Sequence, residues 1–202
     1  MTLDGFRPLA NRLIQPFIAG AKRAGLGPNA VTALALVMAG AAAVAFYAAG
    51  EEPLLYLLGA FFVVCNGLLD LLDGALARDL GVESRAGDVF DHVLDRYADI
   101  LIIAGLAAGV EEYAIGFAAV TGVLMTSYLG TQAQAVDLDR VYGGALGRAD
   151  RLALIVLVAV PAALVETAWL GLTVIGWLLV VFAIVGHVTA LQRFYYAVRE
   201  LP

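Results

Sequence analysis

The sequence predicts an all-α integral membrane protein in which six transmembrane helices follow an N-terminal amphipathic surface helix, with both termini in the cytoplasm. Composition is the first reason: 62% of the 202 residues are apolar and only 15% are charged, against roughly 25% charged residues in soluble domains. A soluble fold of this length could not bury so many apolar side chains. The second reason is the recurrence of segments apolar enough to cross a bilayer. The third is the one-sided distribution of basic residues.

The N-terminal segment, residues 1–27, has the pattern of a helix that lies on the membrane surface. Apolar residues at helical spacing are interrupted by basic ones: Phe6, Leu9, Leu13, Phe17 and Ile18 alternate with Arg7 and Arg12. Such a helix buries its apolar face at the lipid boundary. We therefore expect residues 1–27 to form a juxtamembrane segment and residues 28–202 to form a six-helix bundle, together a single domain, 1–202.

The six spans follow from the length of the apolar segments. A helix rises about 1.5 Å per residue, so roughly 20 residues cross the hydrocarbon core. The predicted spans are about 30–49, 53–78, 87–110, 113–136, 150–165 and 169–194. In the third span, Gly105 and Gly109 lie one helical turn apart, a spacing that lets helices approach closely, either within the chain or at a dimer seam. Cys65, the only cysteine, lies inside the second span, so no disulfide forms within the chain.

The charges between the spans indicate the orientation of the chain. One set of connections is purely acidic and contains Glu51, Glu52, Glu111, Glu112 and Glu166. The other set, with the termini and the adjoining span ends, contains every basic residue, including Arg78, Arg85, Arg96, Arg140, Arg148 and Arg151. Because basic residues are retained in cytoplasmic loops, both termini are expected on the cytoplasmic side of the cell membrane.

The overall charge bears on partners and source. A net charge of −6 argues against nucleic acid, since no dense Lys/Arg patch is present to displace counterions from phosphates. Eleven of the twelve basic residues are Arg and only Lys22 is Lys. Acidic, Lys-poor surfaces suit a very salty cytoplasm, so a halophilic source is a compositional hypothesis.

Acidic residues gather at the inner ends of the second and third spans, where charges are costly and usually mark function. The second span carries Asp70 and Asp73, and the third carries Asp88, Asp91, Asp95 and Asp99. Residues three or four apart share a helix face, and the short connection 79–86 makes the two spans antiparallel neighbours. Converging carboxylates repel, so one or two divalent cations with oxygen ligands are the expected remedy. The nearby Arg78, Arg85 and Arg96 are too few to pair with all six acids.

Other residues around the acids indicate a ligand pocket. Gly74 lies within a helix, where glycine costs about 1 kcal/mol of stability relative to Ala, and Gly87 begins the third span. Without side chains, both leave room for a ligand against the backbone. Arg78 can bind a phosphate with its forked guanidinium. His92, beside the acids, is a candidate base or a hydrogen-bonding residue.

Together, Asp70-x-x-Asp73-Gly74-x-x-Ala77-Arg78, eight residues, and Gly87-x-x-x-Asp91-x-x-x-Asp95 resemble the signature of the CDP-alcohol phosphotransferase (phosphatidyltransferase) family. The resemblance implies a transferase of phospholipid biosynthesis that moves a phosphatidyl- or archaetidyl-type group from a CDP-lipid to a small alcohol and releases CMP. It implies a two-metal Mg²⁺ or Mn²⁺ site on Asp70, Asp73, Asp91 and Asp95. It also implies a CDP pocket formed by Asp70, Asp73, Gly74, Ala77, Arg78 and Gly87.

In this chemistry, the metals draw charge from the diphosphate while the acceptor oxygen attacks the lipid-side phosphorus in line. A base must take the hydroxyl proton. Asp95 is expected in this catalytic role, which the resemblance gives to the last aspartate, and it should be only loosely coordinated because a metal-bound acid is a poor base. Asp88 and Asp99 lie outside the signature and are expected to have supporting or structural roles.

The acceptor is indicated by residues beyond the signature. Ser127, before Tyr128, together with Arg148, Arg151 and Arg193, resembles the branch that uses inositol phosphate, in which arginines bind a second phosphate. Where that branch has a Lys and more charge after Ser-Tyr, this chain has Gly130, Gln132 and Gln134. Glycerol phosphate and serine therefore stay open as acceptors. The donor is CDP-archaeol if the source is halophilic, or otherwise CDP-diacylglycerol. The remaining expected partners are membrane lipids and a second copy in a homodimer.

Three other classes of membrane protein fit the sequence less well. A small ion-coupled transporter would place acids near mid-membrane and carry an inverted repeat, and the sequence has neither. An intramembrane prenyltransferase normally has more spans and lacks the Gly-x-x-Ala-Arg continuation. A purely structural protein would not explain Gly74 and Gly87 beside four acids.

Overall fold

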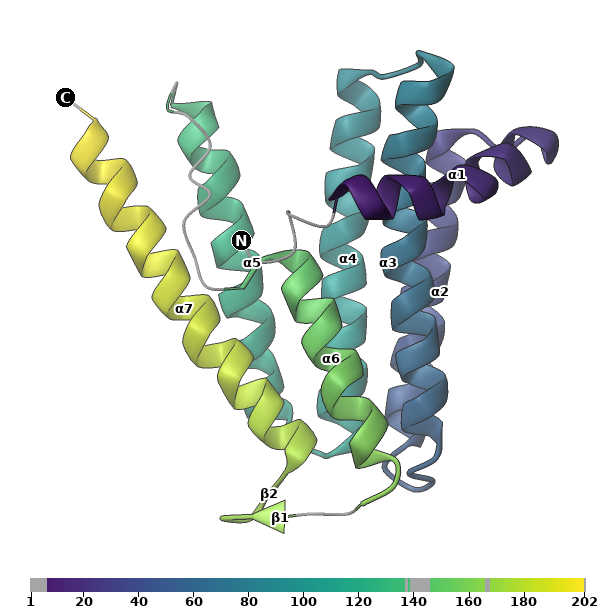
Figure 1. Ribbon diagram of the computed structural model, residues 1–202. Coiled ribbons are helices and arrows are strands. Elements are labelled where there is room, and N and C mark those ends of the chain that lie inside the picture. The colour runs from purple at the N-terminus through teal and green to yellow at the C-terminus, as the bar shows by residue number, and fades with distance from the viewer. Residues whose placement is uncertain (1–6, 137, 139–145, 166–167, 202) are drawn as a thin grey trace.

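The computed structural model describes residues 7–136, 138, 146–165 and 168–201. These residues form helices and one short hairpin (Figure 1). The helices are α1 (Arg7–Arg23), α2 (Pro28–Ala48), α3 (Leu55–Leu80), α4 (Arg85–Gly109), α5 (Tyr113–Ala135), α6 (Arg148–Ala162) and α7 (Val174–Glu200). The hairpin pairs β1 (Ala168–Trp169) with β2 (Leu172–Thr173) in antiparallel register. The expected all-helical fold, with a separate N-terminal helix, is confirmed.

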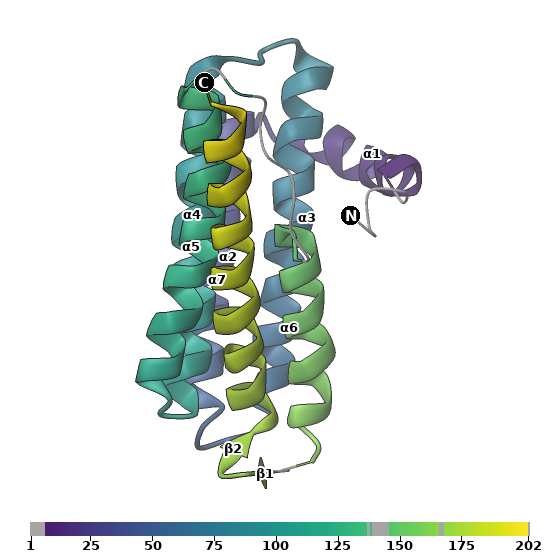
Figure 2. The ribbon, with the colours of Figure 1, turned by 90° about the vertical axis from the view of Figure 1, so that its left-hand side faces the viewer.

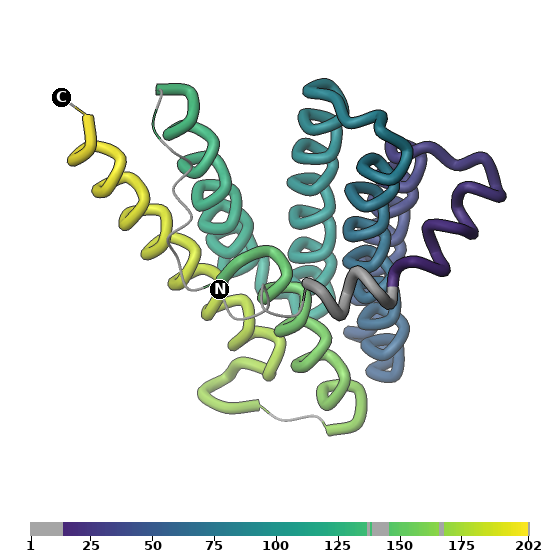
Figure 3. The backbone as a smooth tube through the Cα atoms, turned by 45° about the horizontal axis from the view of Figure 1, so that its top comes forward, coloured from purple at the N-terminus to yellow at the C-terminus, as the bar shows by residue number. Residues whose placement is uncertain are grey.

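Helices α2 to α7 run along the length of the bundle, and α1 lies across them (Figure 1). The turned view shows α1 projecting from the bundle beside α3 (Figure 2). The tube shows α2, α3 and α4 as one group and α5 with α7 as another, with α6 between them (Figure 3). The α3–α4 connection and the C-terminal end of α7 lie at one end of the bundle, and the hairpin lies at the other.

The boundaries of α3 and α4 follow from local sequence signals. Gly81 ends α3 in the left-handed conformation, with φ of 64°, which glycine adopts without steric cost. Ser84 begins α4 as its N-cap, with Oγ accepting a hydrogen bond of 3.0 Å from the Gly87 amide. The connection is thus only a few residues long, and it holds the end of α3 beside the start of α4.

Helix α1 is fixed to the end of α3 that carries the aspartates. Apolar side chains of α1 and α3 form a small buried cluster, which also includes the start of α2: Ile14, Ile18, Ala21, Val31, Leu72, Ala75 and Leu76. An ion pair between Lys22 and Asp79 joins the two helices at the surface. The segment that links α1 to α2 is thereby held next to the end of α3.

The close helix approach predicted at Gly105 and Gly109 occurs within the chain. A Cβ atom at Gly105 would lie 2.5 Å from the backbone of Ala43, and one at Gly109 would lie 2.2 Å from the Phe46 carbonyl oxygen. Both glycines therefore face α2. This finding favours the interpretation as internal packing over a dimer seam.

Gly109→Ala is expected to destabilise the protein, because its new methyl group overlaps the Phe46 carbonyl and α4 must move away from α2. Such overpacking costs about 1–3 kcal/mol, so the thermal unfolding midpoint in detergent should fall by several degrees. Gly40→Ala, in the neighbouring helix, is the matched control: its methyl group meets nothing within 4 Å. Equal midpoints for the two variants would refute this packing.

Each of the six predicted spans corresponds to one helix, α2 to α7, but not all six resemble ordinary membrane spans. Among the described residues, α2, α3, α5 and α7 are long and apolar enough to cross a membrane. Helix α4 carries charged residues over its first half. Helix α6 has 15 residues, about 22 Å of helix, and is shorter than a typical span. Arg140 and Glu166, used for the orientation, lie outside the described residues.

The predicted start of the last span at residue 169 is wrong. Residues 168–173 form the hairpin, and its turn has positive φ at Leu170 (51°) and Gly171 (81°). Helix α7 begins only after Thr173, whose Oγ accepts a 3.1 Å hydrogen bond from the Gly176 amide. The hairpin was missed because its residues are as apolar as a membrane helix, so hydropathy does not reveal the turn.

Large apolar side chains point outward along the helices, as expected for a protein in lipid. Phe61, Phe117, Leu157 and Leu191 are each more than half exposed. Soluble monomers rarely expose such continuous apolar surface. The chain is therefore an all-α membrane protein.

Candidate active site

Three carboxylates meet between α3 and α4, two helices that both pack against α2. Oxygen atoms of Asp70, Asp91 and Asp95 all lie within 4.8 Å of one another, and the three side chains are partly buried. Asp91 and Asp95 share a face of α4 because they are four residues apart. The fourth predicted member, Asp73, is not part of this group and lies in the adjoining pocket beside Asp91. The expected convergence is thus confirmed for three of the four aspartates.

These residues fit a divalent cation. Within the described chain, Oδ2 of Asp73 and Oδ1 of Asp91 are buried and lack a hydrogen-bond partner. A buried carboxylate oxygen without a partner is costly, and a cation would satisfy it. Carboxylate oxygens are also the ligands that Mg²⁺ and Mn²⁺ prefer.

A pocket of about 360 Å³ opens beside the acids. It lies between the start of α2, the end of α3 and the start of α4. Its lining includes Asn29, Thr32, Asp73, Gly74, Ala77, Arg78, Ser84, Gly87, Asp88 and Asp91. Of the residues predicted to bind CDP, only Asp70 lies elsewhere, on the side of α3 that faces α6. The pocket is within the usual size range of small-molecule sites.

Gly74 keeps this pocket open without being required by packing. A Cβ atom there would meet only the Arg78 guanidinium, at an ordinary 3.5 Å. A Cβ atom at Gly87 would lie 3.2 Å from Ser84 Oγ, so the N-cap of α4 is one reason for glycine at that position. The space next to Gly74 is available to a ligand.

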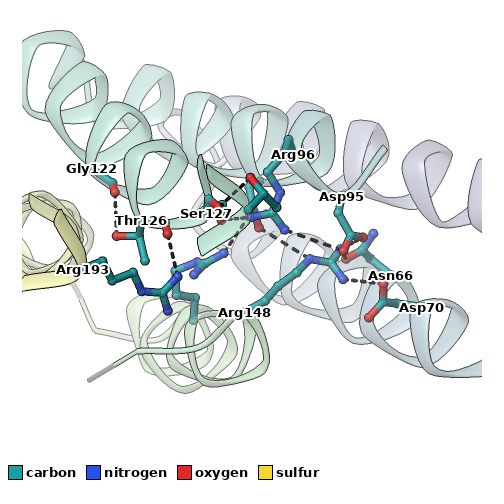
Figure 4. A network of polar contacts seen from close by, with 12 residues as sticks. Asn66, Asp70, Asp95, Arg96, Gly122, Thr126, Ser127, Arg148 and Arg193 are labelled. Atoms are coloured by element: carbon teal, nitrogen blue, oxygen red, sulfur yellow. Dashed lines mark hydrogen bonds and ion pairs between the residues drawn. The ribbon is translucent and has the colours of Figure 1, made fainter. Parts of the chain in front are cut away.

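Arg148, the first residue of α6, reaches the carboxylates. Its Nη1 lies 2.6 Å from Asp70 Oδ1, and its Nη2 lies 2.9 Å from Asp95 Oδ1. Figure 4 shows the guanidinium pointing toward both acids. Helix α6 begins part-way down the bundle (Figure 1), and this depth brings Arg148 level with them.

The other predicted acceptor residues belong to the same polar network (Figure 4). Nη2 of Arg151 donates a 2.7 Å hydrogen bond to Asp99 Oδ2. Arg96 donates to the Ser127 hydroxyl and lies 3.7 Å from Asp95. Nη1 of Arg193, from α7, donates a 2.6 Å bond to the carbonyl of Thr126. The network therefore connects α4, α5, α6 and α7 around the carboxylates.

Two polar residues were missed or undervalued in the sequence. Asn66 is fully buried; its Nδ2 donates to the Ala35 carbonyl (2.9 Å), and its Oδ1 accepts from Arg148 (3.3 Å). Its signal was an amide inside an apolar span, one turn before Asp70. Asp99, expected only to support the site, is contacted by three arginines. His92 is exposed, and its Nδ1 lies 2.9 Å from the Asp88 carbonyl oxygen, in keeping with the hydrogen-bonding alternative.

This chain is similar to known proteins over most of its length. A family model described as CDP-alcohol phosphatidyltransferase matches residues 26–189. The archaetidylinositol phosphate synthase of Methanothermobacter thermautotrophicus is 31% identical over 200 residues, covering 98% of this chain and 95% of the relative. The phosphatidylinositol phosphate synthase of Streptomyces avermitilis is 31% identical over 195 residues, covering 93% and 78%.

Solved structures of a relative show the same fold. The phosphatidylinositol phosphate synthase of Mycobacterium tuberculosis with CDP-DAG bound has a TM-score of 0.78 at 26% identity, covering 92% of this chain and 94% of that one. The same enzyme in complex with manganese and citrate has a TM-score of 0.77 at 26% identity, covering 90% and 87%. The likeness thus extends over nearly the whole of both chains.

Proposed function

The chain belongs to the CDP-alcohol phosphatidyltransferase family, and we propose that it transfers a phosphatidyl- or archaetidyl-type group from a CDP-lipid to inositol phosphate. The observation that carries the proposal is the position of Arg148, within hydrogen-bonding distance of Asp70 and Asp95. It brings a phosphate-binding side chain to the carboxylates where the reaction would occur. The named relatives are synthases of archaetidylinositol phosphate and of phosphatidylinositol phosphate.

The donor would bind in the pocket beside Asp73. Arg78, at its wall, can bind diphosphate oxygens through its planar fork. Gly74 lets the nucleotide approach the backbone of α3. The lipid-side phosphate would then lie next to the carboxylates of Asp91 and Asp95.

The enzyme uses Mg²⁺ or Mn²⁺, and Asp70, Asp73, Asp91 and Asp95 would hold the metal. The bound cation supplies charge neutralisation to the diphosphate and to the departing CMP. The fit rests on the clustered oxygen atoms of three aspartates and on the unpartnered oxygens of Asp73 and Asp91.

The acceptor would approach from the side of α6. Arg148 and Arg151 would bind its phosphate, with Ser127 and Arg193 at the edge of the same network. Asp95 takes the proton of the attacking hydroxyl, whose oxygen forms a bond to the lipid-side phosphorus. The bond from that phosphorus to the bridging oxygen breaks, and CMP leaves with the electron pair. Arg148, 2.9 Å from Asp95, fixes the orientation of the base.

The test is CMP release by the purified protein in detergent with Mn²⁺ and either CDP-archaeol or CDP-diacylglycerol. Inositol phosphate, glycerol phosphate, serine and plain inositol are offered separately. Release that depends on inositol phosphate and not on inositol is expected, because the arginines recognise the phosphate. If CMP is released only with glycerol phosphate or only with serine, that compound is the acceptor in place of inositol phosphate. The preferred lipid decides between archaetidyl and phosphatidyl transfer.

We also propose that α2 to α7 all cross the membrane as one domain, with both termini and the active site at the cytoplasmic surface of the cell membrane. Support comes from the one-sided distribution of basic residues, and from the common end at which the α3–α4 connection and the end of α7 lie. A homodimer completes the proposal. Its interface would have to lie away from Gly105 and Gly109, which pack against α2.

Filling the donor pocket should weaken donor binding without unfolding the protein. Gly74→Leu projects a side chain into the pocket, so KM for CDP-lipid should rise about tenfold or more, as expected from an overpacking cost of about 1–3 kcal/mol. KM for inositol phosphate should stay within about twofold. Gly20→Leu, at an exposed position of α1 where a Cβ atom meets nothing within 4 Å, is the control. An unchanged KM for CDP-lipid in Gly74→Leu would place the donor elsewhere.

A further inference from the structure

Asp99 lies outside the family signature, yet three arginines surround it. Its side chain is only 4% exposed. Oδ2 lies 2.7 Å from Arg151 Nη2 and 3.5 Å from Arg96 Nη1, and Oδ1 lies 3.7 Å from Arg148 Nε. No other carboxylate in the described chain has ion pairs with three guanidinium groups.

Electrostatics gives this arrangement a definite effect on the arginines. Three guanidinium groups close together repel one another, and a buried anion between them offsets that repulsion. Arg148 and Arg151 are three residues apart on α6 and share a face, and the two oxygens of Asp99 divide between them. Asp99 thereby holds both guanidinium groups beside the carboxylate cluster.

The arginines keep hydrogen-bonding capacity for a second anion. A guanidinium has five N–H donors, and Arg151 has one nitrogen within ion-pairing distance of Asp99. Asp99 already fixes the orientation of this guanidinium. Its remaining N–H donors therefore lose little conformational freedom when they bind a phosphate. This pre-orientation favours the acceptor and leaves the donor pocket, on the other side of α3, untouched.

We propose that Asp99 is a positioning residue for the acceptor: it orients Arg148 and Arg151 so that their guanidinium groups bind the acceptor phosphate. The inference rests on the proposed function, since it deepens the assignment of the acceptor side. Asp99 itself does not touch the substrate. A purely structural role, in which Asp99 only ties α4 to α6, predicts a different pattern of kinetic changes.

The test is Asp99→Asn, which keeps the shape of the side chain and removes its charge. KM for inositol phosphate is expected to rise about tenfold to a hundredfold, the usual effect of losing a charged hydrogen-bond partner. KM for CDP-lipid and the Mn²⁺ dependence should stay near wild type, whereas the thermal midpoint should fall, because the three arginines lose the buried anion that offsets their repulsion. Asp79→Asn, which removes an exposed carboxylate paired with Lys22, is the matched control and should leave both KM values unchanged.

Arg151→Lys keeps the positive charge but loses the fork, and provides a second variant should Asp99→Asn fold poorly. It should also raise KM for inositol phosphate alone. Asp99 acts through the arginines, so the double variant with Asp99→Asn and Arg151→Lys should not show the full combined effect. Its rise in KM for inositol phosphate should be smaller than the product of the two single rises. Additive effects would contradict the proposed coupling.

The outcomes separate this inference from the function on which it rests. If the folded wild-type protein releases no CMP with inositol phosphate, both the positioning role and the proposed function are overturned. If the wild type is active and Asp99→Asn keeps its acceptor KM, or raises the donor KM as much as the acceptor KM, the positioning role alone is overturned. If Asp99→Asn does not fold, an unchanged acceptor KM in folded Arg151→Lys overturns it.

Discussion

Asp95→Asn is expected to lower kcat for CMP release by about 10²–10⁴-fold, the usual contribution of a general base. The amide cannot accept the proton of the attacking hydroxyl. The substitution preserves the shape of the side chain, and its amide oxygen can still accept a hydrogen bond from Arg148. The measurement is single-turnover CMP release with both substrates at saturation, which separates the chemical step from binding.

Donor binding is the control for Asp95→Asn. The variant should still bind CDP-lipid in the presence of Mn²⁺, because Gly74, Arg78 and the rest of the pocket are unchanged. Asp79→Asn, at the surface, should release CMP at the wild-type rate. A kcat for Asp95→Asn within about tenfold of wild type would assign the base to another residue, with His92, 3.7 Å from Asp91, as the next candidate.

Asp91→Asn is expected to raise the Mn²⁺ concentration needed for half-maximal CMP release by at least about tenfold, since even residues that only support metal ligands change affinity 10–100-fold. Oδ1 of Asp91 is buried without a hydrogen-bond partner in the described chain. An amide there removes a negative charge and presents a weaker ligand.

Metal binding itself gives a readout that is independent of activity. Mn²⁺ titrated into the substrate-free protein and followed by electron paramagnetic resonance should bind more weakly to Asp91→Asn than to wild type. Excess Mn²⁺ should restore part of the activity of Asp91→Asn, whereas it should not restore Asp95→Asn. Wild-type Mn²⁺ affinity in Asp91→Asn would show that this carboxylate is not a ligand.

The sequence could predict much of this site because the relevant distances are short along the chain. Asp91 and Asp95 share a helix face by spacing alone. Gly81 ends α3 and Ser84 begins α4, so Asp70 comes to lie opposite Asp91 and Asp95. Gly74 and Arg78 line one pocket for the same reason. Helical periodicity and one tight connection therefore suffice to predict the carboxylate cluster and the donor side.

The position of Asp73 beside the three-carboxylate cluster, rather than within it, could not be predicted. Asp70 and Asp73 are offset by about 60° around the helix axis. That offset is small enough to count as one face, yet α3 is rotated so that Asp70 meets Arg148 on α6 while Asp73 lies in the pocket between α2 and α4. Helix rotation depends on packing, which hydropathy and charge do not determine.

The contacts of Arg148 and Asp99 were also beyond prediction. Both sets of contacts depend on how deep in the bundle α6 begins, and the amino-acid sequence before α6 does not indicate that depth. The positive-inside rule accounts for arginines near residue 148 without any role in a site. Only the arrangement of α3, α4 and α6 distinguishes an arginine that orients the chain from one that reaches the carboxylates.

The proposed reaction transfers the lipid-side phosphate to inositol phosphate and releases CMP. The most direct test uses CDP-lipid carrying ³²P in the lipid-side phosphate, incubated with inositol phosphate and Mn²⁺. The label is expected to move into a lipid that contains two phosphates, and the released CMP should be unlabelled. Asp95→Asn should form neither the labelled lipid nor CMP. Label in a water-soluble product, or the same label transfer without inositol phosphate, would contradict the proposed reaction.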